Sequence, residues 1–185
     1  FSVANAGQSL CWLAQNSQGQ RVVVQSVGGY EPKRISTHAL EHEISKYTTV
    51  DDAIGWGEVW DGRAFYLLTF PTQNVTWAFD LSGERPQIHQ RGYWQAGDWQ
   101  AWRGRCHCVV NGRHLVGSRT TGIIYEQSLN TYDDAGDDLR WLRQPPRIWQ
   151  ENRRLFHRNL ELHQEPGVGG MGPGDPLVDL EWSND

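Results

Sequence analysis

The sequence has few cysteines, no excess of positive charge and no long apolar run. Three cysteines, Cys11, Cys106 and Cys108, are too few for a disulfide framework, and their odd number favours a reducing compartment. The net charge of −5 lacks the basic excess that is typical of proteins that bind nucleic acid. No apolar run is long enough to span a membrane, and the first residues do not have the pattern of a signal peptide. The sequence therefore predicts no membrane partner and no direct nucleic-acid site.

Methionine is also scarce. The chain contains one methionine, and none at position 1. The C-terminal run LEWSND (residues 180–185) stops where a strand would enter its turn. Both features indicate a piece of a longer chain.

Tryptophan and glycine are abundant, with ten and twenty residues respectively. Tryptophan suits the half-buried surfaces of sheets, and glycine suits tight turns. The central stretch 59–80 shows this combination best. Its Asp61-Gly62 turn leads into the apolar run 64–70, which predicts a strand covered on both faces. In the strand that follows, Val75, Trp77 and Phe79 alternate with Thr76 and Ala78, which predicts that one face of the strand is more apolar than the other.

Similar units recur along the chain. Asn111-Gly112 is the strongest hairpin signal, and Gln18-Gly19-Gln20 resembles an earlier turn. Turns about 45 to 50 residues apart have the blade spacing of a β-propeller. The expected fold is all-β, with propeller-like blades and one short helix over 38–46, capped by Thr37; a β-sandwich with the same strands is the alternative. Three units are expected near 9–36, 53–93 and 98–126, within a region that spans 1–150. Residues 151–185 are expected to begin a further, truncated β segment, with strands over 154–163 and 176–182.

Three groups of residues contain possible metal ligands, and none of them predicts a metal site. Cys106 and Cys108 point to one face of a strand and His107 to the other, so they predict buried structural cysteines rather than a zinc site. The acidic run of Asp133, Asp134, Asp137 and Asp138 lacks the EF-hand order and predicts a solvated turn. His38 and His42 predict a solvated helix face.

The sequence predicts no catalytic residue, no cofactor and therefore no enzyme, because it has no nucleophile motif, phosphate loop or paired catalytic carboxylates. Asn74-Val75-Thr76 is a glycosylation sequon by pattern only. The expected functional surface is an interface between proteins, made by aromatic and arginine side chains. The candidate interface residues are Trp94, Trp99, Trp102, Arg147, Arg153 and Arg154.

Several spaced motifs resemble one known family. They include RISTHALE (34–41), FYLLTFPT (65–72), TWAFD (76–80) and HLVGSRTTGIIY (114–125), with Arg147-Ile148, Leu160-Glu161-Leu162 and Gly167-Val168-Gly169 further on. Together they resemble the packaged-DNA stabilisation proteins, or tail accessory factors, of short-tailed bacteriophages (podoviruses), which are longer than this chain. The chain would then be the C-terminal part of such a protein, without its end.

The resemblance implies a propeller-like structural protein of the virion, assembled in the cytoplasm of the bacterial host. Such proteins form a homo-oligomeric ring in the phage tail, contact the portal and adaptor proteins and the tail needle or spikes, and help to close the channel on packaged DNA.

Two other functions remain open from the residues alone. The tryptophans, the aspartates and the partial Asp-box at Ser183-Asn184-Asp185 would suit a carbohydrate-binding or sialidase-like propeller module. The same composition would also suit an interaction propeller of a cellular protein.

Overall fold

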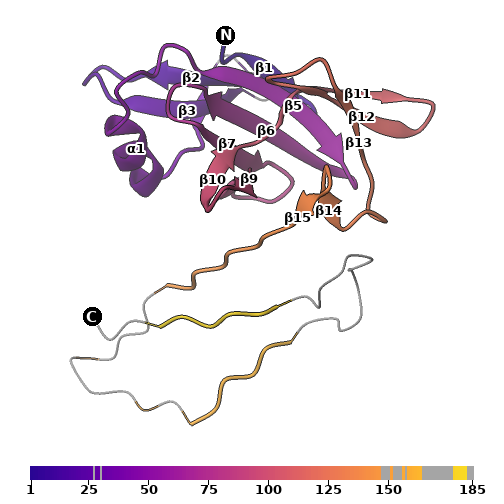
Figure 1. Cartoon of the computed structure of the whole chain (residues 1–185). Coiled ribbons are helices and arrows are strands. Elements are labelled where there is room, and N and C mark those ends of the chain that lie inside the picture. The colour runs from indigo at the N-terminus through magenta and orange to yellow at the C-terminus, as the bar shows by residue number, and fades with distance from the viewer. Residues whose placement is uncertain are drawn as a thin grey trace.

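The computed structural model describes residues 1–26, 28–29, 31–146, 151, 156, 158–163 and 177–182. In this part of the chain, five antiparallel sheets and one short helix follow one another (Figure 1). The first two sheets are four-stranded meanders: β1 (Ala4–Ala6), β2 (Ser9–Gln15), β3 (Arg21–Ser26) and β4 (Lys33–Arg34), then β5 (Ile54–Trp60), β6 (Arg63–Phe70), β7 (Val75–Asp80) and β8 (Gln87–Gln90).

The remaining sheets are smaller. The third large sheet has the order β11 (Gly104–Val110), β12 (Arg113–Ser118) and β13 (Ile124–Gln127). Two hairpins accompany it: β9 (Gly92–Gln95) with β10 (Asp98–Ala101), and β14 (Asp133–Asp134) with β15 (Asp137–Asp138).

The predicted hairpin turns have the backbone that their residues favour. Asp61 and Gly62 have φ angles of 49° and 72°, and Asn111 and Gly112 have φ angles of 52° and 77°. Two successive positive φ angles match the right-handed twist of the flanking strands, which is why Asp-Gly and Asn-Gly are found in such turns. These turns set the register of β5 with β6 and of β11 with β12.

The large sheets stack face to face and enclose two apolar cores. The first core lies between the first and second sheets and includes Tyr66, Leu68 and Phe79. The second core joins the second and third sheets through Trp56, Leu67 and Val116. Strand β6 therefore has both faces buried, as the sequence predicted.

The helix α1 (His38–Ser45) closes the end of the first core. The Thr37 side chain accepts a hydrogen bond from the Leu40 backbone N–H and so caps the helix N-terminus. Leu40 and Ile44 lie on one face and are both buried. The chain therefore forms the predicted helix at the predicted place. Among the described residues, no helix has the length and hydrophobicity that crossing a membrane requires.

The first strands of the three large sheets are neighbours. Strand β5 lies between β1 and β11 and contacts both. This arrangement, in which successive antiparallel sheets stack with their first strands together, is the one that propeller blades adopt.

Five expectations need correction. Strand β7 is covered on both faces, because Thr76 and Ala78 are fully buried between sheets, like Phe79. The end of the unit expected near 53–93 forms two separate strands, β8 and β9, and the acidic turn contains the hairpin β14–β15. Strand β1 was not foreseen, since its residues have no apolar pattern. The described residues 158–163 and 177–182 are extended chain with no strand partner; the rest of those two expected strands lies outside the described residues.

Candidate functional site

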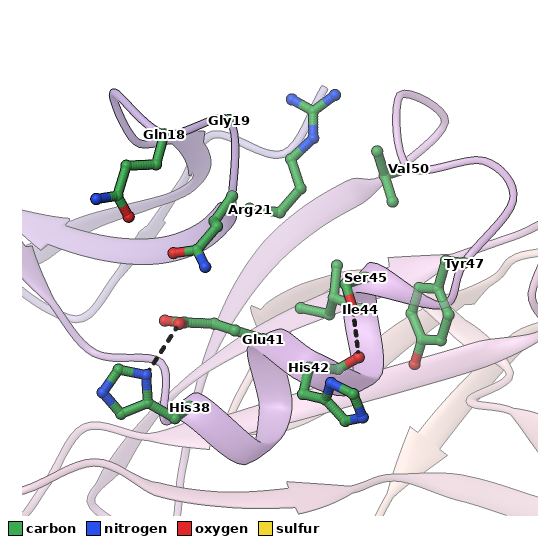
Figure 2. A pocket seen from close by; sticks show the side chains of 11 residues that line it. Gln18, Gly19, Arg21, His38, Glu41, His42, Ile44, Ser45, Tyr47 and Val50 are labelled. Atoms are coloured by element: carbon green, nitrogen blue, oxygen red, sulfur yellow. Dashed lines mark hydrogen bonds and ion pairs between the residues drawn. The ribbon is translucent and has the colours of Figure 1, made fainter.

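One pocket lies between α1 and the turn that joins β2 and β3 (Figure 2). It has a volume of about 450 Å³, and its lining includes Arg21, His38, Glu41 and His42. In Figure 2 the His38 ring points toward the Glu41 carboxylate, with Nδ1 3.8 Å from Oε2. His42 is exposed on the same helix, as the sequence predicted.

The main charged groups at this pocket already have partners in the chain. Arg34 donates through Nε to Glu41 Oε1 at 2.6 Å, and Ser36 Oγ donates to the same oxygen. Arg21 forms an ion pair with Asp51 at 3.2 Å. Glu41 is therefore a buried carboxylate that ties α1 to the segment before it, and the pocket presents no free catalytic carboxylate.

A second pocket, of about 330 Å³, lies where β1, β5 and β11 meet. Its lining includes Asn5, Gly57, Glu58 and His107. The Glu58 side chain is fully buried and forms an ion pair with Arg91, which follows β8. A buried carboxylate needs such a partner, because removing its hydration costs several kcal/mol. Glu58 thus connects β5 to the residue after β8 within the second sheet, at a point next to the third sheet.

Two histidines stack beside that pocket. His107 Nε2 lies 3.0 Å from His114 Nδ1, and the ring planes are 20° apart. The edge of Trp60 packs on His114. Burial lowers the pKa of His107; Glu58 raises it, and His114 and Arg91 lower it again. One ring must stay neutral to accept the hydrogen bond, so the pair is sensitive to acid.

The aromatic hairpin β9–β10 holds two of the three tryptophans that were predicted to form an interface. Trp94 and Trp99 are cross-strand partners whose rings meet edge to face, with centroids 5.4 Å apart. The guanidinium carbon of Arg140 lies 3.9 Å from the centre of the Trp94 ring. Both indoles are half-buried. They pack on each other and on arginine within the chain.

Trp102 is the third predicted interface residue, and it lies at the second core. It packs against Trp56, Leu67 and Val116, and Arg91 stacks on its ring at 4.4 Å. Trp102 is half-buried, so part of the ring still reaches the surface. The three predicted arginines, Arg147, Arg153 and Arg154, lie outside the described residues.

The acidic hairpin is fastened to the body of the protein by Arg103. This arginine forms ion pairs with Asp134, at 3.4 Å from Nε to Oδ2, and with Asp137. Its guanidinium also stacks on Tyr93, 3.7 Å from the ring centre. Burial raises the pKa of Asp134, and the charge of Arg103 opposes that effect. The prediction of a solvated acidic turn was therefore wrong for Asp134, whose side chain is 10% exposed. Asp137, whose side chain is 46% exposed, is paired with the same arginine, which lies just before β11.

The asparagine of the sequon connects the second sheet to β10. Asn74 lies in the β6–β7 turn with φ 54°. Its Nδ2 donates to Gln100 Oε1, and its Oδ1 accepts from the Ala101 backbone N–H at 3.1 Å. The side chain is therefore occupied by contacts between strands. Thr76, the third residue of the sequon, is fully buried.

The three cysteines are free thiols in two different environments. Cys11 is fully buried in the first core, where burial raises its pKa to about 11. Cys106 and Cys108 are exposed, so the prediction that they are buried was wrong. Their face of the third sheet has no covering sheet among the described residues.

The contacts described above connect sheets and strands to one another, and none of them forms a recognisable set of catalytic groups. In the part of the chain that the structure describes, no three histidine, cysteine or acidic side chains gather as a metal site would need. The buried carboxylates Glu41, Glu58 and Asp80 are each paired with an arginine. Sequence reasoning missed these pairs, because their partners are separated along the chain and only the fold brings them together.

Comparison with known proteins identifies the family. A search of curated proteins finds no match to this chain. The family described as "Bacteriophage P22 Gp10, beta-propeller" matches residues 1–132, which is most of the chain and includes all three large sheets. The sheets stack as propeller blades do, and the family is one of phage structural proteins. This chain therefore belongs to the bacteriophage P22 Gp10 β-propeller family.

Proposed function

We propose that this chain serves as a non-enzymatic structural protein of the phage tail, where it helps to close the portal and adaptor channel and retain packaged DNA. The observation that carries the proposal is the family match over residues 1–132. The matched region includes each of the three stacked sheets, so it covers a continuous structural unit.

The internal chemistry of the chain supports a structural role. The charged side chains that are buried in the described part form ion pairs which join one element to another, as Glu58 does with Arg91 and Arg103 with Asp134. A general acid or base needs a proton-accepting group that can reach a substrate. Carboxylates already bound to arginine serve packing better than proton transfer.

The proposed partners are the portal and adaptor proteins, the tail needle or spikes, and further copies of the protein in a ring. The protein would join the particle after assembly in the host cytoplasm. Trp94 and Trp99 would contribute the hairpin β9–β10 as a preformed aromatic unit, since each already packs on the other. Trp102, Arg147, Arg153 and Arg154 remain predicted interface residues.

The experiment combines location with loss of function. Antiserum raised against the chain is applied to purified virions and viewed by electron microscopy, and denatured virions are probed by immunoblot. A stop codon in the gene then gives particles without the protein. We expect label at one vertex, and mutant heads that package DNA but fail to protect it from DNase.

The possible results separate the parts of the proposal. Absence of the antigen from denatured virions would overturn the virion role. Antigen at the vertex, together with normal DNA retention in the mutant, would overturn channel closure while leaving the structural role intact. Label spread evenly over the capsid would contradict the tail location.

The sugar-binding alternative receives no support from Trp94 and Trp102. A sugar needs an open indole face for stacking. The Trp94 face carries Arg140, and the Trp102 face carries Arg91. The Asp-box residues 183–185 lie outside the described residues.

A further inference from the structure

The third sheet has one covered face and one open face. Val116 packs into the second core on the covered face. Alternate residues of a strand point to opposite faces, and Cys106 is opposite Gly117, which is opposite Ile124. Cys106, Cys108 and Ile124 therefore share the open face. All three are exposed, Ile124 by 68%.

The open face carries one exposed ion pair, between Arg113 on β12 and Glu126 on β13, beside its apolar side chains. Val110, 47% exposed, lies on the same face as Cys108, two residues away on β11. In contrast, the face of the first sheet that packs on the second is buried in the first core, and the face of the second sheet that packs on the third is buried in the second core. A contiguous exposed apolar surface of this kind usually marks a place where another element packs.

The chain also contains a strand-like segment with an apolar side and no partner. Within residues 177–182, the exposed fractions of Val178, Leu180 and Trp182 are 59%, 61% and 79%. Asp179 and Glu181 alternate with them, on the side that begins with Leu177. This period of two is typical of a strand with one buried face. In Figure 1 the segment, drawn in yellow, runs as extended chain apart from the sheets.

We propose that in solution residues 177–182 fold back from the extended position of Figure 1 and cover the open face of the β11–β12–β13 sheet of their own chain. Val178, Leu180 and Trp182 would pack on Cys106, Cys108 and Ile124. Asp179 and Glu181 would then point to solvent. In both the segment and β11, every second residue contributes to the apolar surface, so the two surfaces can pack on each other. This proposal does not depend on the proposed role in the virion.

Chain order favours this sheet over the first one. The outer face of the first sheet carries Val22 and Val24, which are only 7% and 8% exposed, so little apolar area is left there. Elements close in sequence are usually neighbours in space, and the third sheet is nearer to residues 177–182 along the chain than the first sheet is. The third sheet also has three strands where the first two have four.

Tethering favours the same chain over a second copy. A segment joined by a flexible linker is present at an effective concentration of about millimolar near its own sheet. A second copy reaches that level only in concentrated solution. The same-chain arrangement therefore predicts cover that does not change on dilution.

The test uses the natural thiols of the open face. The full chain is labelled with a maleimide under native conditions, and mass spectrometry follows Cys106, Cys108 and Cys11 separately. We compare the wild type with the double variant Leu180→Asp/Trp182→Asp. The matched control, Asp179→Asn/Glu181→Gln, changes the opposite side of the same segment.

We expect Cys106 and Cys108 to react about tenfold more slowly in the wild type and the control than in the double variant, because labelling would need local opening. Cys11 is 0% exposed and should stay unlabelled in each folded protein, which reports that the variant folds. Equal rates for Cys106 and Cys108 in the wild type and the double variant would overturn the proposal. Protection that is lost on dilution would assign the cover to a second copy and would also overturn it.

A second variant gives an independent answer. Leu180→Cys places a thiol on the apolar side of the segment. Oxidised glutathione should then form a disulfide with Cys106 or Cys108 inside one chain, visible as a monomer with the corresponding linked peptide. Failure to form that link while the chain stays folded would contradict the packing.

Discussion

Gly57 on β5 lies directly against the backbone of Asn5, the central residue of β1. A Cβ atom built on Gly57 would stand 1.8 Å from the Asn5 carbonyl oxygen. Real Cβ atoms do not approach so closely, so the two strands can be neighbours only if position 57 has no side chain. Glycine in the second sheet thus sets how closely the first sheet packs on it.

Gly57→Ala should therefore destabilise the protein strongly. Asn5 contributes backbone at the contact, and backbone cannot move aside as a flexible side chain would. We expect a loss of about 3 kcal/mol in the free energy of unfolding, measured by urea denaturation. Gly122→Ala is the control, because a Cβ there meets nothing within 4 Å. Equal midpoints for the two variants would refute the close approach.

The ion pair between Glu58 and Arg91 gives a second prediction. The Glu58 side chain is fully buried, whereas that of Arg91 is 23% exposed. Arg91→Met would leave an unpaired buried carboxylate and remove the guanidinium from the Trp102 ring. We expect a loss of about 3 kcal/mol in unfolding free energy.

The matched control for Arg91 is an arginine in an exposed pair. Arg113 and Glu126 are paired at 2.7 Å, but their side chains are 66% and 40% exposed. Arg113→Met should cost less than about 1 kcal/mol, because water screens an exposed pair. If the two methionine variants were equally stable, burial of Glu58 would not be the source of the effect.

Local features of the fold could be predicted from the sequence. The Asp61-Gly62 and Asn111-Gly112 turns have a chemical reason to adopt positive φ, and Thr37 has one to cap a helix. The apolar run from Ala64 to Phe70, which follows a turn signal, predicted the doubly covered strand that the structure shows. In each case the deciding interactions lie within a few residues along the chain.

The candidate surfaces could not be predicted in the same way, since they depend on which sheet faces which. Cys106 and Cys108 alternate like core residues, yet their face is open in the described chain. The sequence around Asp134 predicts a solvated turn, but in the fold Asp134 is paired with Arg103, which lies 31 residues earlier in the sequence. Burial of a sheet face and pairing of distant charges are tertiary properties, and a local pattern does not contain them.

His107 should make stability depend on pH. Burial lowers its pKa from the usual 6.5, so the unfolded chain binds this proton more readily than the folded chain. The stabilisation from neutral His107 is then fully present above the unfolded value and is lost as the pH falls through it toward the lower folded value. We expect unfolding free energy to decrease between about pH 7.5 and pH 5, and to decrease less in His107→Gln.

The pH experiment needs a histidine that lies outside the stacked pair. His42 is exposed on α1, so His42→Gln should reproduce the wild-type pH dependence. The pKa of His89 is also lowered by burial and by Arg91, which leaves a residual slope in His107→Gln. The same slope in His107→Gln as in the wild type would contradict a contribution from the stacked pair.

Arg103 should control whether the acidic hairpin β14–β15 stays on the body of the protein. In this hairpin Asp134 is directly opposite Asp137, and the two carboxylates repel each other unless a cation lies between them. Arg103→Met removes that cation and its stacking on Tyr93, so we expect faster amide hydrogen exchange and faster proteolysis within residues 133–138. Arg105→Met changes an exposed arginine two residues further on, in β11, and should leave both rates unchanged. Hydrogen exchange measured by mass spectrometry decides the matter: an unchanged hairpin in Arg103→Met would mean that its own backbone pairing, rather than the arginine, holds it in place.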